Sequence, residues 1–153
     1  MSKPVCLVIG AGAGIGGTVG RRFARDGYHA VLCRRSNKQG LNDLVAEIES
    51  DGGSATGFIL NAVEVNSIEN QVNEVEREIG PIEVVVFNLG AQTGTHSLAD
   101  TSLKSFEIGW RMATFALFRT AKAVFPHMEA RGHGTLLVTS ATAAMRGNAA
   151  QHA

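Results

Sequence analysis

A run of glycines directly after a short apolar segment is the feature that most restricts how this chain can fold. Residues 5–9 (VCLVI) have the composition of a buried strand, and glycines follow at positions 10, 12, 14, 16 and 17. A helical pattern begins immediately afterwards, so these glycines belong to a strand-to-helix turn. Glycine adopts backbone angles that other residues resist, and its missing Cβ lets a diphosphate approach the backbone. The free N–H groups at the start of the helix would face that diphosphate, which predicts a dinucleotide site.

Two glycine spacings fit this turn. Positions 12, 14 and 17 match G-x-G-x-x-G, whereas positions 10, 14 and 16 match G-x-x-x-G-x-G. The second is preferred because Gly10 is the first residue after the strand, where the turn must begin. A tight turn without a ligand is the alternative that the pattern leaves open. The residues of this loop expected to contact the dinucleotide are Gly10, Ala13, Gly14, Ile15 and Gly16.

The rest of the chain alternates apolar strand patterns with amphipathic helix patterns. Strands are expected at 5–9, 30–33, 55–60, 82–87 and 135–139, with helices at 15–26, around 41–48, after 66 and at 103–131. This alternation predicts an α/β fold, a doubly wound parallel sheet in the order 3-2-1-4-5, with helices on both faces. The whole chain, 1–153, is expected to form one dinucleotide-binding domain. Its fifth strand would be an apolar edge, covered by a partner or by further parts of a larger fold.

Three local details are expected in the helices. Ile15, Val19 and Phe23 are four residues apart and predict the apolar face of the first helix. The segment Asn66-Ser67-Ile68-Glu69 resembles a capping box with Asn66 as the cap. Pro126 predicts a kink in the long helix.

Composition excludes several classes of function. Lys plus Arg and Asp plus Glu both number 14, so no global field favours nucleic acid or an anionic membrane. No apolar run is long enough for a membrane span, and the N-terminus lacks a signal-peptide pattern, which favours a cytoplasmic setting. Cys6 and Cys33 fall in predicted strands as free thiols. The five histidines show no metal-ligand spacing, so no metal site is expected.

The residues after the second strand favour one form of the cofactor. A carboxylate there would bind the ribose hydroxyls of NAD. The chain has Arg34, Arg35 and Ser36 instead, and its next acidic residue is Asp43. Guanidinium groups bind phosphate, so NADP is expected and NAD is less favoured. A solvated turn is the alternative explanation for the two arginines.

Polar and small residues also follow the third and fourth strands. Asn61 and Ala62 follow the third strand, where an amide could meet the adenine edge. Asn88 and Gly90 follow the fourth, where a small residue allows the ribose to approach. Each alone is ordinary turn chemistry, but their positions at successive strand ends join them to the same expected site.

These motifs together resemble the short-chain dehydrogenase/reductase family. Gly10-x-x-x-Gly14-Ile15-Gly16 is similar to its cofactor loop, with Ile9 where Thr is usual, and residues 87–90 (FNLG) are similar to its Asn-Asn-Ala-Gly segment. Residues 80–82 (GPI) and 125–128 (FPHM) are also similar. The resemblance implies the cofactor-binding part of an NAD(P)-dependent oxidoreductase, which with the two arginines would transfer hydride between NADP(H) and a carbonyl or alcohol substrate. It also implies that the C-terminal part of the family fold is lacking.

The resemblance implies catalytic Ser, Tyr and Lys residues with a supporting Asn. The Ser position falls on Ala141, the Asn position on Ala113, and the Tyr-x-x-x-Lys would begin after Ala153. Two hypotheses therefore stand: an oxidoreductase incomplete or altered at its catalytic positions, and a non-catalytic NADP-binding sensor or partner subunit. The resemblance further implies a homo-oligomer formed through the long helix, where Phe118 and Phe125 are among the candidate contacts.

Overall fold

The strands and helices of the computed structural model follow the expected alternation over the residues it describes, 3–90 and 96–147. Every strand lies within one residue of its expected ends. The elements are β1 (Val5–Ile9), α1 (Ile15–Arg25), β2 (His29–Arg34), α2 (Lys38–Ser50), β3 (Ser54–Ile59), α3 (Ser67–Glu78), β4 (Ile82–Phe87), α4 (Leu103–Trp110), a π-helical segment (Arg111–Phe115), α5 (Ala116–Arg131), β5 (Thr135–Val138) and α6 (Thr142–Arg146).

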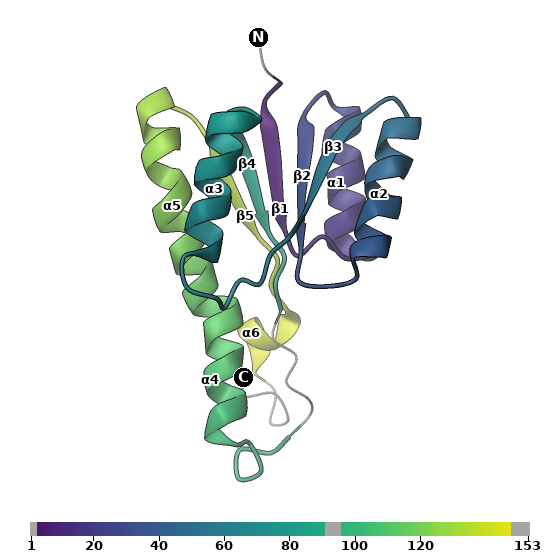
Figure 1. Ribbon diagram of the computed structural model, residues 1–153. Helices are drawn as coiled ribbons and strands as arrows, with labels where there is room; N and C mark the ends of the chain where they lie inside the picture. The colour runs from purple at the N-terminus through teal and green to yellow at the C-terminus, as the bar shows by residue number, and fades with distance from the viewer. Residues whose placement is uncertain (1–2, 91–95, 148–153) are drawn as a thin grey trace.

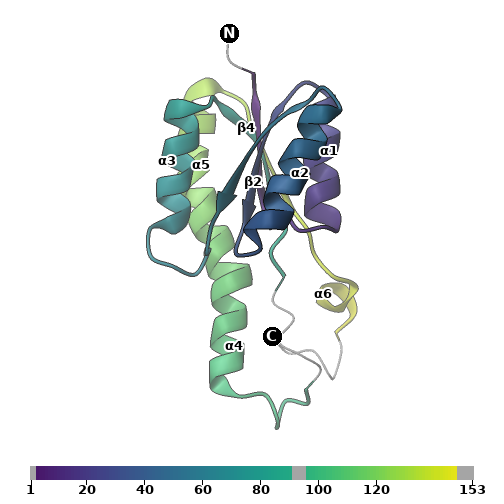
Figure 2. The ribbon, with the colours of Figure 1, turned by 45° about the vertical axis from the view of Figure 1, so that its right-hand side comes forward.

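The five strands form one parallel sheet in the order β3-β2-β1-β4-β5, which confirms the predicted doubly wound fold. Helices α1 and α2 cover one face, and α3 and α5 cover the other (Figure 1, Figure 2). Successive side chains of a strand point to opposite faces. Val5, Leu7 and Ile9 therefore join the core under α3 and α5, while Cys6 and Val8 join the core under α1 and α2. Both faces of the central strands are buried, as their continuous apolar sequence requires.

The first helix does not bury the face that its sequence predicts. Ile15 is 63% exposed. The buried residues of α1 are instead Gly16, Gly17, Gly20 and Ala24. Val19 and Phe23 pack only at the border of the core. Small residues let α1 approach the sheet closely, and this approach turns the larger side chains toward the rim.

The expected capping box at the start of α3 does not form. Asn66 is the N-cap, but its backbone is left-handed (φ 60°) and its side chain makes no capping hydrogen bond. Glu69, the other half of the motif, instead binds Arg119 of α5 at 2.6 Å. The carboxylate of Glu69 therefore forms a tertiary ion pair and is not available for the local capping box.

The break in the long helix also lies elsewhere than expected. Pro126 lies inside the continuous helix α5, whereas the π-helical segment interrupts the α-helix at 111–115. Pro126 and Lys122, whose carbonyl loses its helical donor, are both exposed, so water can replace the missing bond. Below this interruption, α4 projects past the carboxyl ends of the strands (Figure 1) and buries only Gly109.

Apolar surface remains open at the edge of the sheet and on the long helix. Leu137 and Val138 of β5 are each 46% exposed, as expected for an uncovered edge strand. Phe118 and Phe125 of α5 are 61% and 49% exposed, whereas Leu117 packs against the core. Across 3–90 and 96–147, none of the helices is long and apolar enough to span a bilayer.

Candidate functional site

The site begins at Gly10, the first residue after β1. Its φ is +100°, and a Cβ there would lie 2.6 Å from the carbonyl oxygen of Asn88. The amides of Gly10 and Ala11 both donate to the carbonyl of Cys33, at 3.0 and 2.9 Å. The turn is therefore fixed against both neighbouring strands, and only glycine fits its first position.

The start of α1 packs directly on this turn. A Cβ on Gly16 would collide with the carbonyl oxygen of Gly10, and Gly17 N–H donates to the Gly12 carbonyl at 2.9 Å. The amides of residues 13–16 have no hydrogen-bond acceptor among the described residues. Four free donors thus converge at the positive end of a helix, an arrangement that suits a diphosphate. Because Gly10 and Gly16 pack closely, the amides of residues 13–16 stay accessible to an anion. The turn therefore fits the diphosphate of the dinucleotide that the sequence predicts.

Asn88, directly after the neighbouring strand β4, holds the turn in place. Its Nδ2 donates to the Gly10 carbonyl at 3.0 Å, and its Oδ1 accepts from Thr139 Oγ1 at 2.9 Å. Both ends of the amide are used to join the carboxyl ends of β1, β4 and β5, so Asn88 positions the loop. Gly90 is exposed, and a Cβ there would meet nothing within 4 Å.

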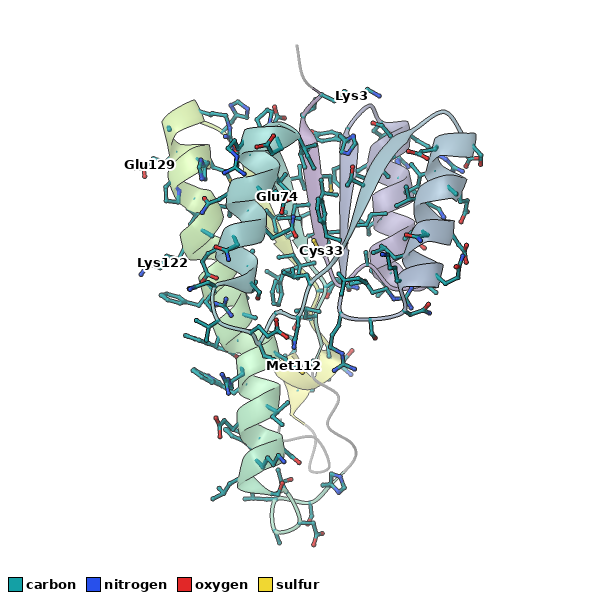
Figure 3. The ribbon with its side chains drawn as sticks, viewed as in Figure 1. Lys3, Cys33, Glu74, Met112, Lys122 and Glu129 are labelled. Atoms are coloured by element: carbon teal, nitrogen blue, oxygen red, sulfur yellow. The ribbon has the colours of Figure 1, made fainter. Side chains whose placement is uncertain are left out.

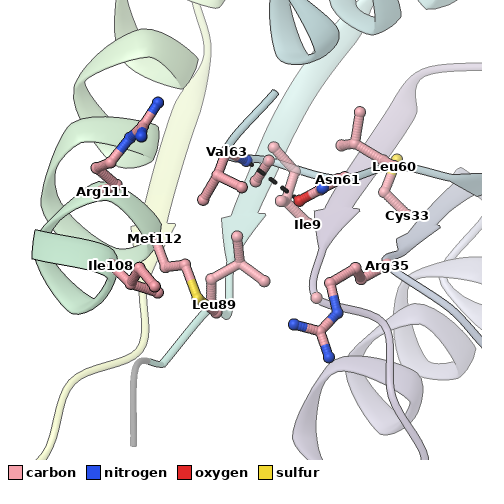
Figure 4. Close-up of a pocket in the computed structure, with 12 residues that line it drawn as sticks. Ile9, Cys33, Arg35, Leu60, Asn61, Val63, Leu89, Ile108, Arg111 and Met112 are labelled. Carbon is pink, nitrogen blue, oxygen red and sulfur yellow. Dashed lines mark hydrogen bonds between the residues drawn. The ribbon is translucent and has the colours of Figure 1, made fainter. Parts of the chain in front are cut away.

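A cavity of about 420 Å³ opens beside this turn, at the carboxyl ends of the strands (Figure 4). The strand ends and the loop after β3 form one side, and the long helix forms the other. The lining residues are Ile9, Gly10, Cys33, Arg35, Leu60, Asn61, Ala62, Val63, Leu89, Ile108, Arg111 and Met112. Four of the predicted cofactor residues, Gly10, Arg35, Asn61 and Ala62, are therefore brought together here. Its position is where doubly wound folds bind their ligands.

The two arginines at the end of β2, Arg34 within the strand and Arg35 directly after it, have different surroundings. Arg35 lines the cavity, whereas Arg34 packs its guanidinium toward Gly40 at the start of α2. Ser36 is exposed and does not line the cavity. The nearest following carboxylate, Asp43, accepts a hydrogen bond from Gln39 within α2. The end of β2 therefore presents one cation and no anion to the cavity.

The loop after β3 supplies the cavity wall at Asn61 and Ala62. Asn61 Oδ1 accepts from the Val63 amide at 3.4 Å, and Asn61 Nδ2 donates to Glu64 Oε1 at 2.9 Å. The side-chain amide thus shapes its own turn.

The same loop is held from behind by Arg119 of α5. Arg119 Nη1 donates to the Ala62 carbonyl at 2.8 Å, while Nε and Nη2 bind both oxygens of Glu69, at 2.8 and 2.6 Å. Hydrogen bonding to this guanidinium lowers the pKa of Glu69 below its ordinary value of 4.5. Arg119 therefore fixes the wall from outside the cavity.

Sequence reasoning missed part of the cavity lining. Five of the missed residues lie at strand ends or in the loops that follow them, where position alone could have found them: Ile9, Cys33, Leu60, Val63 and Leu89. Burial raises the pKa of the Cys33 thiol to about 12, so the thiol is a neutral wall group. The remaining contributions, from Ile108, Arg111 and Met112, have no local signal because they depend on where the helix crosses the sheet. Figure 3 shows Met112 below the strand ends and Cys33 within the sheet.

No proton-transferring side chain stands at the two positions that the family resemblance singled out. Ala113 is half-buried in the π-helical segment, and Ala141 is exposed between β5 and α6. Tyr28 precedes β2 at the opposite, amino end of the sheet, where its ring packs edge-on to Phe23 at 5.2 Å. Lys122 points away from the sheet (Figure 3). Within 3–90 and 96–147, no group of three His, Cys, Asp or Glu side chains could hold a metal ion.

Comparisons with known proteins agree with this fold. The family model described as short chain dehydrogenase matches residues 4–153. Dehydrogenase/reductase SDR family member 4 of Pongo abelii is 30% identical over 144 residues, which cover 94% of this chain and 51% of that protein. The chain spans about half the length of the curated relatives it matches.

Two solved structures are similar over nearly the whole chain. An actinorhodin polyketide ketoreductase with NADPH has a TM-score of 0.89 and 28% identity, and the match covers 97% of this chain and 57% of that one. An NAD⁺-bound xylitol dehydrogenase has a TM-score of 0.89 and 25% identity, covering 96% and 56%. With a matching family model over almost its full length, this chain belongs to the short-chain dehydrogenase/reductase family, whose members bind NAD(P) cofactors.

Proposed function

We propose that this chain binds NADP(H) in preference to NAD(H), as the cofactor-binding part of an oxidoreductase. The observation that carries the proposal is the packing of Gly10 against Gly16, which leaves the amides of residues 13–16 free at the start of α1. These amides would hold the pyrophosphate. Arg35 supports the choice of NADP, because it brings a positive charge to the end of β2, where the cofactor ribose is expected.

Four more of the predicted residues would lie along the same ligand. Asn61 and Ala62 would line the adenosine end, and Asn88 and Gly90 would lie toward the nicotinamide end. The bound cofactor would supply a hydride donor or acceptor for a carbonyl or alcohol substrate. The chain's own residues would hold and orient it and, through the apolar cavity walls, exclude water.

A second candidate is an NADP-binding sensor or partner subunit without turnover. Ala113 and Ala141 favour it, since neither side chain can move a proton or donate a hydrogen bond to substrate. The two candidates share the binding step and differ only in chemistry.

Calorimetric titration of the chain with NADP⁺ and NAD⁺ tests the binding step. Arg35→Leu should weaken NADP⁺ by about 10- to 100-fold, the range for one lost charge-assisted contact, and leave NAD⁺ nearly unchanged. Arg34→Leu is the matched control, because its guanidinium faces α2. Equal affinity of the unaltered chain for the two cofactors would remove the proposed preference. Carbonyl reduction over a substrate panel then separates the candidates, because binding without turnover selects the sensor.

A further inference from the structure

The cavity has a second charged wall residue, Arg111, which faces it from the π-helical segment. Of the twelve lining residues, all of them described, only Arg35 and Arg111 carry a charged side chain. Figure 4 shows the two on opposite sides, Arg35 beside the end of β2 and Arg111 on the long helix near Val63. The cavity therefore offers a ligand two separate guanidinium groups.

Arg111 is only loosely held by other residues. Its one ion pair among the described residues joins Nη1 to Glu107 Oε1 at 3.8 Å, with the two side chains 45% and 67% exposed. A pair this long and this exposed contributes little. The guanidinium is therefore free to reorient over a ligand at small cost.

The surface around Arg111 suits a flat heterocycle. Arg111 and Met112 follow Ile108 by three and four residues, so both lie beside it on the helix face that lines the cavity. Val63 and Ala62 complete an apolar wall opposite that face. A guanidinium above such a slot can stack on an aromatic ring or donate hydrogen bonds to its nitrogens.

The path of the ligand places the base in this slot. The free amides of residues 13–16 mark the pyrophosphate, and Arg35 marks the 2′ position of the adjoining ribose. The next part of the ligand is the adenine, and the cavity continues from Arg35 toward Ala62, Val63 and the long helix.

We infer that Arg111 recognises the adenine base, whereas Arg35 recognises the 2′-phosphate. This inference rests on the proposed function and assigns the two cations to different parts of one ligand. Arg111 then contributes equally to the binding of AMP, NAD⁺ and NADP⁺, and it takes no part in the choice between the last two.

The test is calorimetric titration of Arg111→Leu and Arg111→Lys with AMP, NAD⁺ and NADP⁺. Arg111→Leu should weaken all three by the same factor, about three- to fivefold, the range for a half-exposed cation over an aromatic ring. Arg111→Lys should recover only part of the loss, since it keeps the charge without the planar group. Arg77→Leu is the control, because Arg77 lies on α3 with its side chain 72% exposed. This variant should leave all three affinities unchanged.

The outcomes separate the inference from the proposed function. An unchanged affinity for AMP in Arg111→Leu, with normal binding by the unaltered chain, overturns the inference alone. A loss confined to NADP⁺ also overturns it, because Arg111 would then act on the 2′-phosphate with Arg35. If the unaltered chain binds none of the three nucleotides, the proposed function fails, and the inference fails with it.

Discussion

Replacing Arg119 by methionine is expected to cost about 2–3 kcal/mol of unfolding free energy. Arg119 joins α5 to the loop after β3, and its side chain is only 10% exposed, although it is charged. Methionine keeps most of the stem volume, so the change removes mainly the charge and its hydrogen bonds. The prediction therefore isolates the polar contacts from the packing.

The magnitude follows from what each lost contact leaves behind. The Ala62 carbonyl loses a donor at 2.8 Å in a buried position, which costs about 1–3 kcal/mol. Glu69 loses two charge-assisted bonds, but its side chain is 37% exposed and water can solvate it, so its share is smaller. Releasing the buried guanidinium from its desolvation penalty offsets part of the loss.

Urea unfolding followed by far-ultraviolet circular dichroism at pH 7 measures this change. Arg77→Met is the matched control, because its partner is Glu78 and the side chains are 72% and 60% exposed, and we expect it to stay within about 0.5 kcal/mol. If Arg119→Met proves no more destabilising than the control, the reasoning is refuted.

The pH dependence gives an independent check on the same pair. The folded-state pKa of Glu69 is lowered, so its stabilisation is complete above the ordinary value of 4.5 and is lost as the pH falls below it. In Arg119→Met this part of the acid sensitivity should be absent. Identical acid profiles for the two proteins would show that Glu69 gains nothing from Arg119.

Three further predictions follow from other parts of the molecule. Gly16→Ala should destabilise the chain by about 2–3 kcal/mol, because the new Cβ meets the carbonyl oxygen of Gly10. Gly12→Ala, where the new Cβ meets open space, is the control and should leave the stability unchanged. Equal urea midpoints for the two variants would refute this. Burial and the charge of Lys3 lower the pKa of His29, so stability should fall as the pH drops below its ordinary value of 6.5, and His29→Gln should flatten that slope in unfolding titrations. Burial raises the pKa of the Cys6 and Cys33 thiols to about 12, so neither should react with a disulfide reagent at pH 8 until urea unfolds the chain. Rapid reaction of the folded chain would show that the thiols are accessible.

The sheet and its glycine turn could be predicted because their causes are local. Each strand is a short apolar run bounded by turn residues, and the strand–helix alternation admits few topologies. Gly10 needs a positive φ, and Gly16 must leave room for the Gly10 carbonyl. Both requirements appear in the sequence as glycines at a fixed spacing. Arg35 lines the cavity for the same reason, since it follows a strand whose end the sequence predicts.

Local patterns failed where a distant residue competed for the same group. The capping box at Asn66 was wrong because Glu69 binds Arg119, fifty residues away. Two adjacent arginines looked equivalent, yet Arg34, the last residue of β2, packs toward α2, whereas Arg35 lines the cavity.

The order of the strands and the glycine turn can be read from the residues alone, because both depend on backbone geometry and on the polarity of neighbouring residues. The side chains that line the cavity, by contrast, depend on how distant elements pack together. Arg111 and Met112 reach the cavity because the long helix crosses the carboxyl ends of the strands there. That crossing is set by the packing of α3, α5 and the sheet, which no short stretch of sequence encodes.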